Sequence, residues 1–446
     1  MNDSPPHAKK HAKKRPKKQT ATAQADIPSR PPRFWEVLGP GLITGASDDD
    51  PSGIGTYAQV GAQYGYAMGW TMLFSFPLMA AIQEISARIG RVSGHGIAGN
   101  LRQHYPPALL RGIVVLLLIA NVMNLGADLG AMADALKLLI GGPAQLYVVG
   151  FAVLCASLEI FSRYERYVAV LKWTTLVLFT YVGTVFVVRV PWGDVARHLV
   201  APDIQWNKDY LISVVAVFGT TISPYLFFWQ SSEEAEDERV NPAARPLKRD
   251  HAHARTEIRR IRVDTYFGMA VSNLIGLFII ITTAATLYAS GVTDIATSAQ
   301  AAEALRPIAG PLAFVLFSAG IIGTGLLAIP VLAGSVGYAL GEALGWRTGL
   351  GRLPHEAKAF YGVIAVATLL GVGINFVDID PIKALFWSAV LNGIIAVPLM
   401  PVMMMMAMNR KVMGKFILPG LLWFMGWLAT AVMAATVLAM AVSTVV

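Results

Sequence analysis

Ser47-Asp48-Asp49-Asp50-Pro51-Ser52-Gly53 lies in the middle of an apolar run that extends from Gly39 to Tyr66. An uninterrupted helix here would hold three carboxylates, a proline and a glycine among hydrophobic residues, which is most costly in lipid. Because proline has no amide hydrogen and glycine weakens a helix, the stretch predicts two half-helices joined by an unwound turn. A carboxylate beside the backbone carbonyls freed by such a turn indicates a cation site.

The composition is typical of a polytopic membrane protein. Of the 446 residues, 55% are hydrophobic and only 14% are charged, and the mean hydropathy is +0.53. Apolar runs of about twenty residues predict about eleven membrane spans. We expect these spans near Val37–Gln63, Met68–Ile89, Ile113–Leu138, Tyr147–Phe161, Val168–Val188, Tyr210–Phe228, Met269–Leu287, Pro311–Leu344, Ala359–Asn375, Ile382–Met408 and Ile417–Val442.

Most of the formal net charge of +8 comes from residues 1–33, which hold nine basic and two acidic side chains. This segment predicts a disordered tail that lies against anionic lipid, with a specific partner as the alternative, and we expect no nucleic acid to bind. The connections between spans alternate between an arginine-rich set and a set that is poor in net positive charge, because its acids offset its few bases. By the positive-inside rule, the tail is then cytoplasmic and the C-terminus lies outside the cell (inner) membrane.

The sixth span repeats the interruption of the first, at Gly219-Thr220-Thr221-Ile222-Ser223-Pro224-Tyr225. Five spans separate the two interruptions, and because five is odd, the second group of five must cross the membrane in the opposite sense. This pattern predicts an inverted repeat that holds its substrate between two unwound turns. The expected divisions are a tail (1–33), a first five-helix repeat (34–190), a second, inverted repeat (191–408) and an extra C-terminal helix (409–446).

Asp50 is the acid best placed in the first unwound turn, because it directly precedes the proline. Three consecutive residues of a helix diverge by about 100° each, so Asp48, Asp49 and Asp50 cannot all face one cavity. We expect Asp50 to be the main metal ligand, Asp49 a further ligand and Asp48 a residue of the ion path. The alternative is an ion pair, but no Lys or Arg occurs between Trp35 and Gln83.

Polar residues of the other spans could complete the site. Thr220, Thr221 and Ser223 offer hydroxyl or carbonyl oxygen, although Ser and Thr also commonly bond back onto their own helix. Asn124 and Asp128 share one face of the third span, where they could border an ion path or bond neighbouring helices.

Two other polar features have a less direct relation to the site. Asn392 in the tenth span could line the ion path. The acidic stretch from Ser231 to Glu238 is expected to form a solvated face, with the gathering of cations as the alternative.

These residues resemble the NRAMP family of divalent-metal transporters. Gly39-Pro40-Gly41-Leu42-Ile43 ahead of Asp50-Pro51 is similar to that family's Gly-Pro-Gly run and Asp-Pro-Gly-Asn turn, and Ser223-Pro224-Tyr225 stands where its Met-Pro-His turn would be. Asn124-Leu125-Gly126 and the stretch from Ala333-Gly334 to Gly341-Glu342 add to the similarity. The resemblance covers most of the chain after the tail. It implies that Asp50 is the binding aspartate and that a backbone-carbonyl ligand falls at about Thr220.

The departures from the family pattern concern the metal ligands and the proton path. The family's asparagine ligand becomes Gly53 and its methionine ligand becomes Ser223, and the resemblance makes both candidates for the metal site. Its histidine becomes Tyr225, the next histidine becomes Gln230, and its third-span acids become Asn124 and Ala127, with Asp128 one place out of register. We expect Tyr225, Gln230 and Thr221 to be candidates for the ion path, as are Asn124 and Asp128. This pattern resembles the NRAMP-related magnesium transporters, the NRMT branch, which are thought to move hydrated magnesium without obligate proton coupling. Loss of a thioether leaves an oxygen-dominated pocket, which suits an ion that keeps several waters.

We therefore expect an all-α, LeuT-like 5+5 inverted repeat that imports Mg²⁺ as a partly hydrated ion and tolerates Mn²⁺. It should work as a monomer in the lipid bilayer, without a cofactor. One alternative is a proton-coupled Mn²⁺/Fe²⁺ importer, and another is an organic-solute carrier on the same fold, which three acids in the first turn disfavour. A third is a receptor that binds cation without transport. No catalytic constellation is visible in the sequence, so we do not expect an enzyme.

Overall fold

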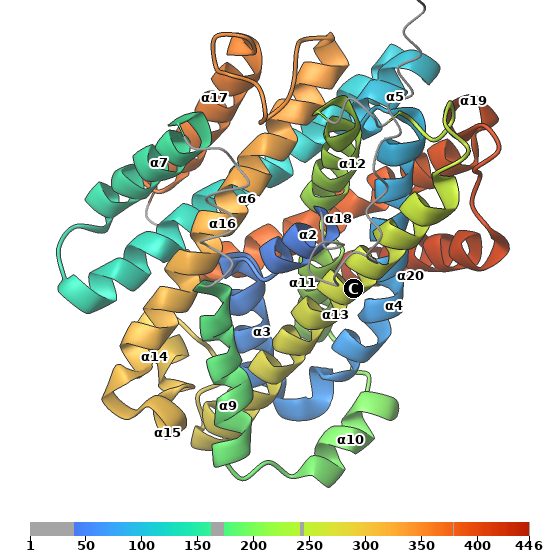
Figure 1. Cartoon of the computed structure of the whole chain (residues 1–446). Helices are drawn as coiled ribbons and strands as arrows, with labels where there is room; N and C mark the ends of the chain where they lie inside the picture. Colours follow the sequence, from blue (N-terminus) through green and yellow to red (C-terminus); the bar gives the residue numbers. More distant parts are fainter. Residues whose placement is uncertain (1–39, 162–173, 241–244, 378, 446) are drawn as a thin grey trace, which may run out of the picture. The chain divides into compact units, whose positions relative to one another are not determined.

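The structure is a computed structural model that describes residues 40–161, 174–240, 245–377 and 379–445 (Figure 1). Every regular element in these ranges is a helix, which confirms the predicted all-α class. The predicted tail, 1–33, lies outside the described residues. The α-helices are α2 (Pro40–Asp48), α3 (Pro51–Tyr64), α4 (Trp70–Ser93), α5 (Ile97–His104), α6 (Pro107–Ile140), α7 (Ala144–Phe161), α9 (Phe179–Val187), α10 (Trp192–Val200), α11 (Lys208–Thr221), α12 (Pro224–Val240), α13 (Ala254–Thr286), α14 (Ser298–Glu303), α15 (Arg306–Ala309), α16 (Ala313–Leu344), α17 (Lys358–Ile374), α18 (Pro381–Met408), α19 (Arg410–Met413) and α20 (Gly420–Val445). Short 3₁₀ turns are η1 (Gly65–Met68), η2 (Thr174–Leu178), η3 (Tyr288–Ser290) and η4 (Gly310–Leu312).

Among the described residues, seven helical segments are long and apolar enough to cross a membrane, so the chain is a multi-pass membrane protein. They correspond to α6, α7, α11 with α12, α13, the α15–α16 segment, α18 and α20. Two further helix pairs are bent, by 107° between α3 and α4 and by 119° between α9 and α10, and α17 is a shorter apolar helix. The predicted span near 168–188 is only partly described, because residues 162–173 lie outside the described ranges.

The first predicted span is broken where the sequence places the acids. Helix α2 ends at Asp48 and α3 begins at Pro51, and Asp50 between them has an extended backbone with φ −68° and ψ 170°. The Asp50 carboxylate caps α3 by accepting a hydrogen bond from the Gly53 amide at 2.7 Å. Proline suits the first position of a helix and aspartate suits the N-cap, so the local sequence itself stops one helix and starts the next.

The sixth predicted span is broken in the same way. Helix α11 ends at Thr221 and α12 begins at Pro224. Both broken helices lie inside the bundle (Figure 1), where α2 packs against α12 and α13, and α3 packs against α11, α13 and α18. The prediction of two unwound turns is therefore confirmed.

Glycines allow the broken helices to approach their neighbours closely. A Cβ atom on Gly45 of α2 would overlap the backbone of Gly268 in α13, and one on Gly41 would lie 2.7 Å from the amide nitrogen of Thr265. On the other half, a Cβ on Gly219 of α11 would overlap the α18 backbone. Small residues at these positions let helices pack backbone to backbone in a membrane.

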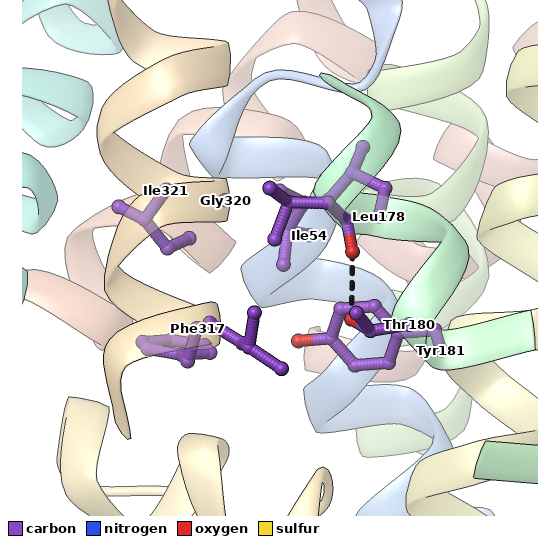
Figure 2. A pocket seen from close by; sticks show the side chains of 9 residues that line it. Ile54, Leu178, Thr180, Tyr181, Phe317, Gly320 and Ile321 are labelled. Atoms are coloured by element: carbon purple, nitrogen blue, oxygen red, sulfur yellow. Dashed lines mark hydrogen bonds between the residues drawn. The ribbon is translucent and has the colours of Figure 1, made fainter. Parts of the chain in front are cut away.

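Helix α3 is also held by an apolar contact just past its capping turn. Ile54 points into a small apolar pocket formed with Leu178, Tyr181, Phe317 and Ile321 (Figure 2). These residues come from η2, α9 and α16, so the start of α3 is anchored to distant parts of the chain.

Candidate metal centre

Asp50 is the centre of the polar contacts at the first break. Its Oδ2 atom accepts a hydrogen bond from Nδ2 of Asn124 at 3.0 Å and lies 3.2 Å from the hydroxyl of Tyr225. Asp50 is 2% exposed, so the carboxylate is closed off from solvent in this conformation. Helices α3, α6 and α12 therefore meet at one buried carboxylate, through Asn124 and Tyr225.

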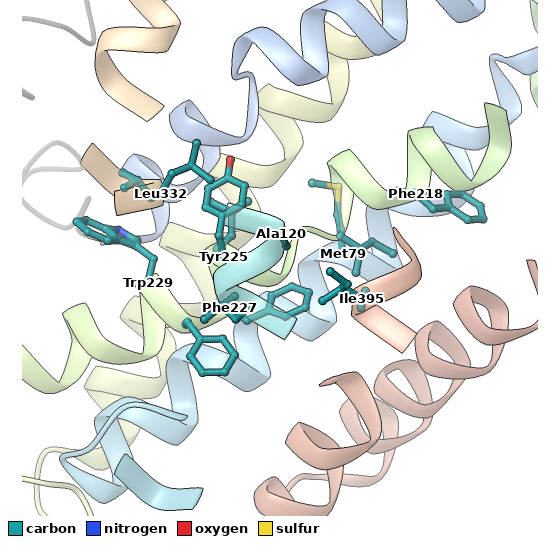
Figure 3. Close-up of a cluster of buried hydrophobic side chains, with 14 of the residues drawn as sticks. Met79, Ala120, Phe218, Tyr225, Phe227, Trp229, Leu332 and Ile395 are labelled. Atoms are coloured by element: carbon teal, nitrogen blue, oxygen red, sulfur yellow. The ribbon is translucent and has the colours of Figure 1, made fainter. Parts of the chain in front are cut away.

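Tyr225 links the two breaks to each other. Its ring lies within a buried apolar cluster (Figure 3), whereas its hydroxyl lies 2.9 Å from the carbonyl oxygen of Ser47 at the end of α2. The single hydroxyl hydrogen can be donated either to that carbonyl or to Asp50. Movement of α12 must therefore change the contacts of the first unwound turn.

Gly53 faces a set of oxygen atoms. The three heavy atoms nearest to the position of a Cβ on Gly53 are the carbonyl oxygen of Asp48 at 3.1 Å, Oγ1 of Thr220 at 3.2 Å and Oδ1 of Asp50 at 3.5 Å. A Cβ at 3.1 and 3.2 Å from two of these atoms would be closer than nearly all real Cβ contacts, so the position favours glycine. Three oxygens from α2, α11 and the turn thus lie around Gly53, and oxygen is the ligand type that hard cations prefer.

At the second break, the hydroxyls bond back onto α11. Ser223 Oγ lies 2.9 Å from the Gly219 carbonyl oxygen and 2.7 Å from the Thr220 carbonyl oxygen, and Thr221 Oγ1 lies 3.0 Å from the Val217 carbonyl oxygen. The back-bonding alternative thus describes Ser223 and Thr221 in this conformation. A carbonyl oxygen has two lone pairs, so the Thr220 carbonyl keeps one acceptor site beside Ser223.

Asp48 and Asp49 point to a different helix from Asp50. Ser272 Oγ in α13 lies 2.5 Å from Oδ2 of Asp48 and 3.1 Å from Oδ1 of Asp49. The three acids thus do not face one site, as predicted, but Asp48 and Asp49 do not diverge from each other, because both contact Ser272. Among the described residues none of the three acids has a salt-bridge partner, so the ion-pair alternative finds no support there.

The remaining candidates divide into two kinds. Asp128 in α6 and Asn392 in α18 are buried, and both carboxylate oxygens of Asp128 and Oδ1 of Asn392 have no hydrogen-bond partner within the described part of the chain. Gln230, in contrast, connects helices: it accepts from Gln83 at 2.5 Å and donates to Thr265 at 2.9 Å. The amide of Gln230 is thus engaged with α4 and α13.

The acidic stretch of α12 does not form a solvated face, so that prediction is wrong. Glu234, Glu236 and Glu238 are buried. Arg260 contacts Glu234 at 2.5 Å, and Arg91 contacts the exposed Asp237 at 2.5 Å. The arginines come from α4 and α13, and their charges make burial of the acids possible.

A cavity of about 300 Å³ lies beside the C-terminal half of α3. Gln59, Gln63, Asp294, Lys383 and Trp387 are among the residues that line it. The Gln59 amide group holds the segment after α13, because its Oε1 accepts from the Ile295 amide at 2.9 Å. This cavity is a candidate entrance on one side of the closed site.

Sequence reasoning missed two residues of α13 that position the site. Ser272 contacts the acids Asp48 and Asp49, and Asp264 accepts a hydrogen bond from the Gly41 amide at 2.7 Å. The sequence held one signal for this contact with α13. Gly41 and Gly45 are spaced so that they share one helix face, and small residues on one face mark it for close packing.

Comparison with known proteins identifies the family of this chain. A profile described as "Natural resistance-associated macrophage protein-like" (Nramp) matches residues 41–443. The chain belongs to the Nramp family. A divalent metal cation transporter MntH from Acidiphilium cryptum (strain JF-5) is 24% identical over 403 residues, which cover 86% of this chain and 84% of the relative. The corresponding protein from Klebsiella pneumoniae subsp. pneumoniae is 26% identical over 412 residues, which cover 89% and 91%.

The fold of this Nramp chain also matches a solved structure. The manganese transporter from Eremococcus coleocola, in complex with an aromatic bis-isothiourea substituted compound, superposes with a TM-score of 0.72. The sequences are 17% identical, and the match covers 93% of this chain and 88% of the other. Together with the two breaks, this match confirms the predicted fold class.

Replacing Tyr225 by phenylalanine is expected to lower divalent-cation uptake about tenfold, because a partner that orients a ligand contributes about 10- to 100-fold to metal affinity. Phenylalanine keeps the ring in its apolar cluster and removes only the hydroxyl that contacts Asp50 and Ser47. Initial uptake rates into proteoliposomes measure the effect. Tyr361→Phe is the matched control, since the Tyr361 hydroxyl bonds to Arg352 in a connection. Equal rates for both variants would contradict a role of Tyr225 at the site.

Proposed function

We propose that this Nramp chain is a divalent-metal transporter whose main cargo is Mg²⁺, carried as a partly hydrated ion, with Mn²⁺ tolerated and without obligate proton coupling. The observation that carries the proposal is the group of oxygens of Asp48, Thr220 and Asp50 that lie within 3.5 Å of the Cβ position of Gly53. Mg²⁺ takes oxygen ligands, so a buried carboxylate next to further oxygen atoms suits it.

Asp50 is the main ligand in this proposal. The carbonyl of Thr220 and the hydroxyl of Ser223 lie together at the second break and would contact the ion directly or through water. Gly53 places no side chain among these oxygens, and Asp49 would join only by leaving Ser272. Serine at position 223 offers a hard oxygen, which favours Mg²⁺ over softer transition ions.

Transport would proceed by alternating access around the two breaks. Asp50 is closed off from solvent here, so the site must open to each side of the membrane in turn. In one arrangement the site would open toward the cavity beside α3 and be closed at the α12 end, and in the other arrangement the opposite would hold. The proposed unit is a monomer with five helices in each inverted repeat, a cytoplasmic N-terminus and an extracytoplasmic C-terminus. The membrane potential can drive uptake, since two charges crossing about 100 mV gain about 4.6 kcal/mol.

Proton-coupled Mn²⁺ transport is the second candidate. The observation in its favour is the name of the similar proteins, which are a manganese transporter and MntH divalent metal cation transporters. This candidate predicts that metal entry acidifies the lumen of a vesicle, whereas the Mg²⁺ proposal does not require it.

Uptake into proteoliposomes distinguishes the two candidates. Mg²⁺, Mn²⁺ and Ca²⁺ are supplied separately at an imposed inside-negative potential, with a pH dye inside the vesicles. We expect Mg²⁺ entry without acidification. Undetectable Mg²⁺ entry together with Mn²⁺ entry that acidifies the lumen would refute the proposal.

Replacing Ser223 by methionine is expected to raise the ratio of Mn²⁺ to Mg²⁺ uptake several-fold, because a thioether favours the softer ion. Ser223→Ala is the matched control: it removes the hydroxyl without adding sulfur, so it should weaken uptake of both ions alike. The ratio is measured by competition between the two metals in proteoliposomes. An unchanged ratio in Ser223→Met would mean that residue 223 does not contact the ion.

A further inference from the structure

An apolar groove lies between the end of α18 and the start of α20. The groove has a volume of about 520 Å³ and is lined by Met404, Met405, Met408, Asn409, Trp423 and Trp427. Met405 is 47% exposed and Trp423 is 42% exposed, so both stand at an open surface. The floor is well packed, since a Cβ on Gly426 of α20 would lie 2.5 Å from the sulfur of Met404.

Positive charge borders one end of this groove. Arg410, Lys411 and Lys415 follow directly after Asn409 and are exposed. The chain holds no Asp or Glu from Pro381 to Val446, so no acid of this segment neutralises them. Lys248 adds a further ammonium group by donating a hydrogen bond to the Lys411 carbonyl.

The nearest acid of the neighbouring connection is already engaged. The hydrogen bond between Asp250 and His253, at 2.9 Å, lowers the pKa of Asp250. His251 packs its ring against Phe416, with the ring centres 5.5 Å apart, which places this connection beside the basic segment. The basic segment and this connection thus hold one carboxylate, that of Asp250, and at least four cationic side chains.

We infer that this groove binds an anionic phospholipid, with an acyl chain along the methionines and tryptophans and the phosphate at Arg410, Lys411 and Lys415. Helix α18 crosses the membrane, so its end lies at the membrane surface, where tryptophan is favoured. Basic residues at the ends of membrane helices bind anionic headgroups, and the apolar groove gives the acyl chain a place to lie. The inference depends on the membrane location and not on the identity of the transported ion.

Binding should stabilise the transporter through α18. This helix packs against α3 and α11, which carry both breaks, and against α20 across the groove. A lipid bound between α18 and α20 adds contacts that only the folded chain provides, so it raises the melting temperature by mass action.

The test uses the purified full-length chain in detergent. Phosphatidylglycerol, phosphatidylcholine or inorganic phosphate is added, and the melting temperature and the lipids retained in native mass spectra are measured. We expect a larger rise in Tm and more retained lipid with phosphatidylglycerol than with phosphatidylcholine, and no change with phosphate. Equal effects of the two lipids, or a rise with phosphate alone, would overturn the inference.

Two triple variants separate the groove from general surface charge. Arg410→Gln/Lys411→Gln/Lys415→Gln should remove the preference for phosphatidylglycerol, whereas Arg347→Gln/Arg352→Gln/Lys358→Gln, with the same change of charge, should keep it. Equal losses in both would overturn the inference. Trp423→Ala tests whether the groove instead binds a second copy of the chain. If the native mass corresponded to two chains without lipid, and to one chain in this variant, the inference would also be overturned. Neither readout involves transport, so a failure here leaves the proposed function untouched.

Discussion

Replacing Asp50 by asparagine is expected to reduce divalent-cation uptake by more than about 100-fold, beyond the 10- to 100-fold typical of residues that only orient a ligand. The side chain keeps its shape, and its remaining oxygen can still accept the hydrogen bond from Gly53 that caps α3. The variant should therefore fold, and the loss should come from the missing negative charge. Uptake of Mg²⁺ and Mn²⁺ into proteoliposomes, at matched amounts of folded protein, measures it.

Two further variants make this result specific. Asp203→Asn changes an exposed acid in a connection and should transport like the wild type. Asp49→Asn tests the other proposed ligand, and because Asp49 contacts Ser272 we expect a smaller loss than for Asp50→Asn. Wild-type uptake by Asp50→Asn would remove the basis for the cation site at the first break.

Replacing Gly45 by valine is expected to destabilise the fold by about 3 kcal/mol or more, at the upper end of the cost of overpacking. A Cβ at this position overlaps the backbone of Gly268, which cannot move aside as a flexible side chain could. Helix α2 would be pushed away from α13, and Asp48 and Asp49 would lose their contact with Ser272. A fall in Tm of the purified chain, together with loss of uptake, measures the effect.

Gly112→Val is the matched control for the same chemical change. A Cβ on Gly112 of α6 has no heavy atom within 4 Å, so the new side chain meets open space. Valine is a better helix former than glycine, so Tm should stay the same or rise slightly. If Gly45→Val kept the Tm and uptake of this control, the contact between α2 and α13 would not position the first break.

The sequence predicts the two breaks and includes two of the residues around the first break among its candidates. Asp50 before Pro51 and Ser223 before Pro224 act locally, through a missing amide hydrogen and a capping carboxylate, so they need no knowledge of the fold. Asn124 and Tyr225 were also placed among the candidates, and the structure brings both to Asp50.

The sequence alone does not predict the partners of the acids in α12. The acids of α12 were expected in solvent because the sequence shows their charge and not the arginines that reach them from α4 and α13. Gln230 was a candidate for the ion path, yet its neighbours on other helices occupy its amide. A pairing of this kind depends on which helix faces are in contact.

By itself, then, the sequence determines that the chain is helical, that it crosses a membrane and where two of its helices unwind, because these properties follow from apolar runs and backbone chemistry within a few residues. Only the tertiary structure decides which groups face the unwound turns. Asp50 meets a residue 74 positions away, and Asp49 meets one 223 positions away. Such contacts exist only once the helices pack, and glycines such as Gly45 set how closely they do so.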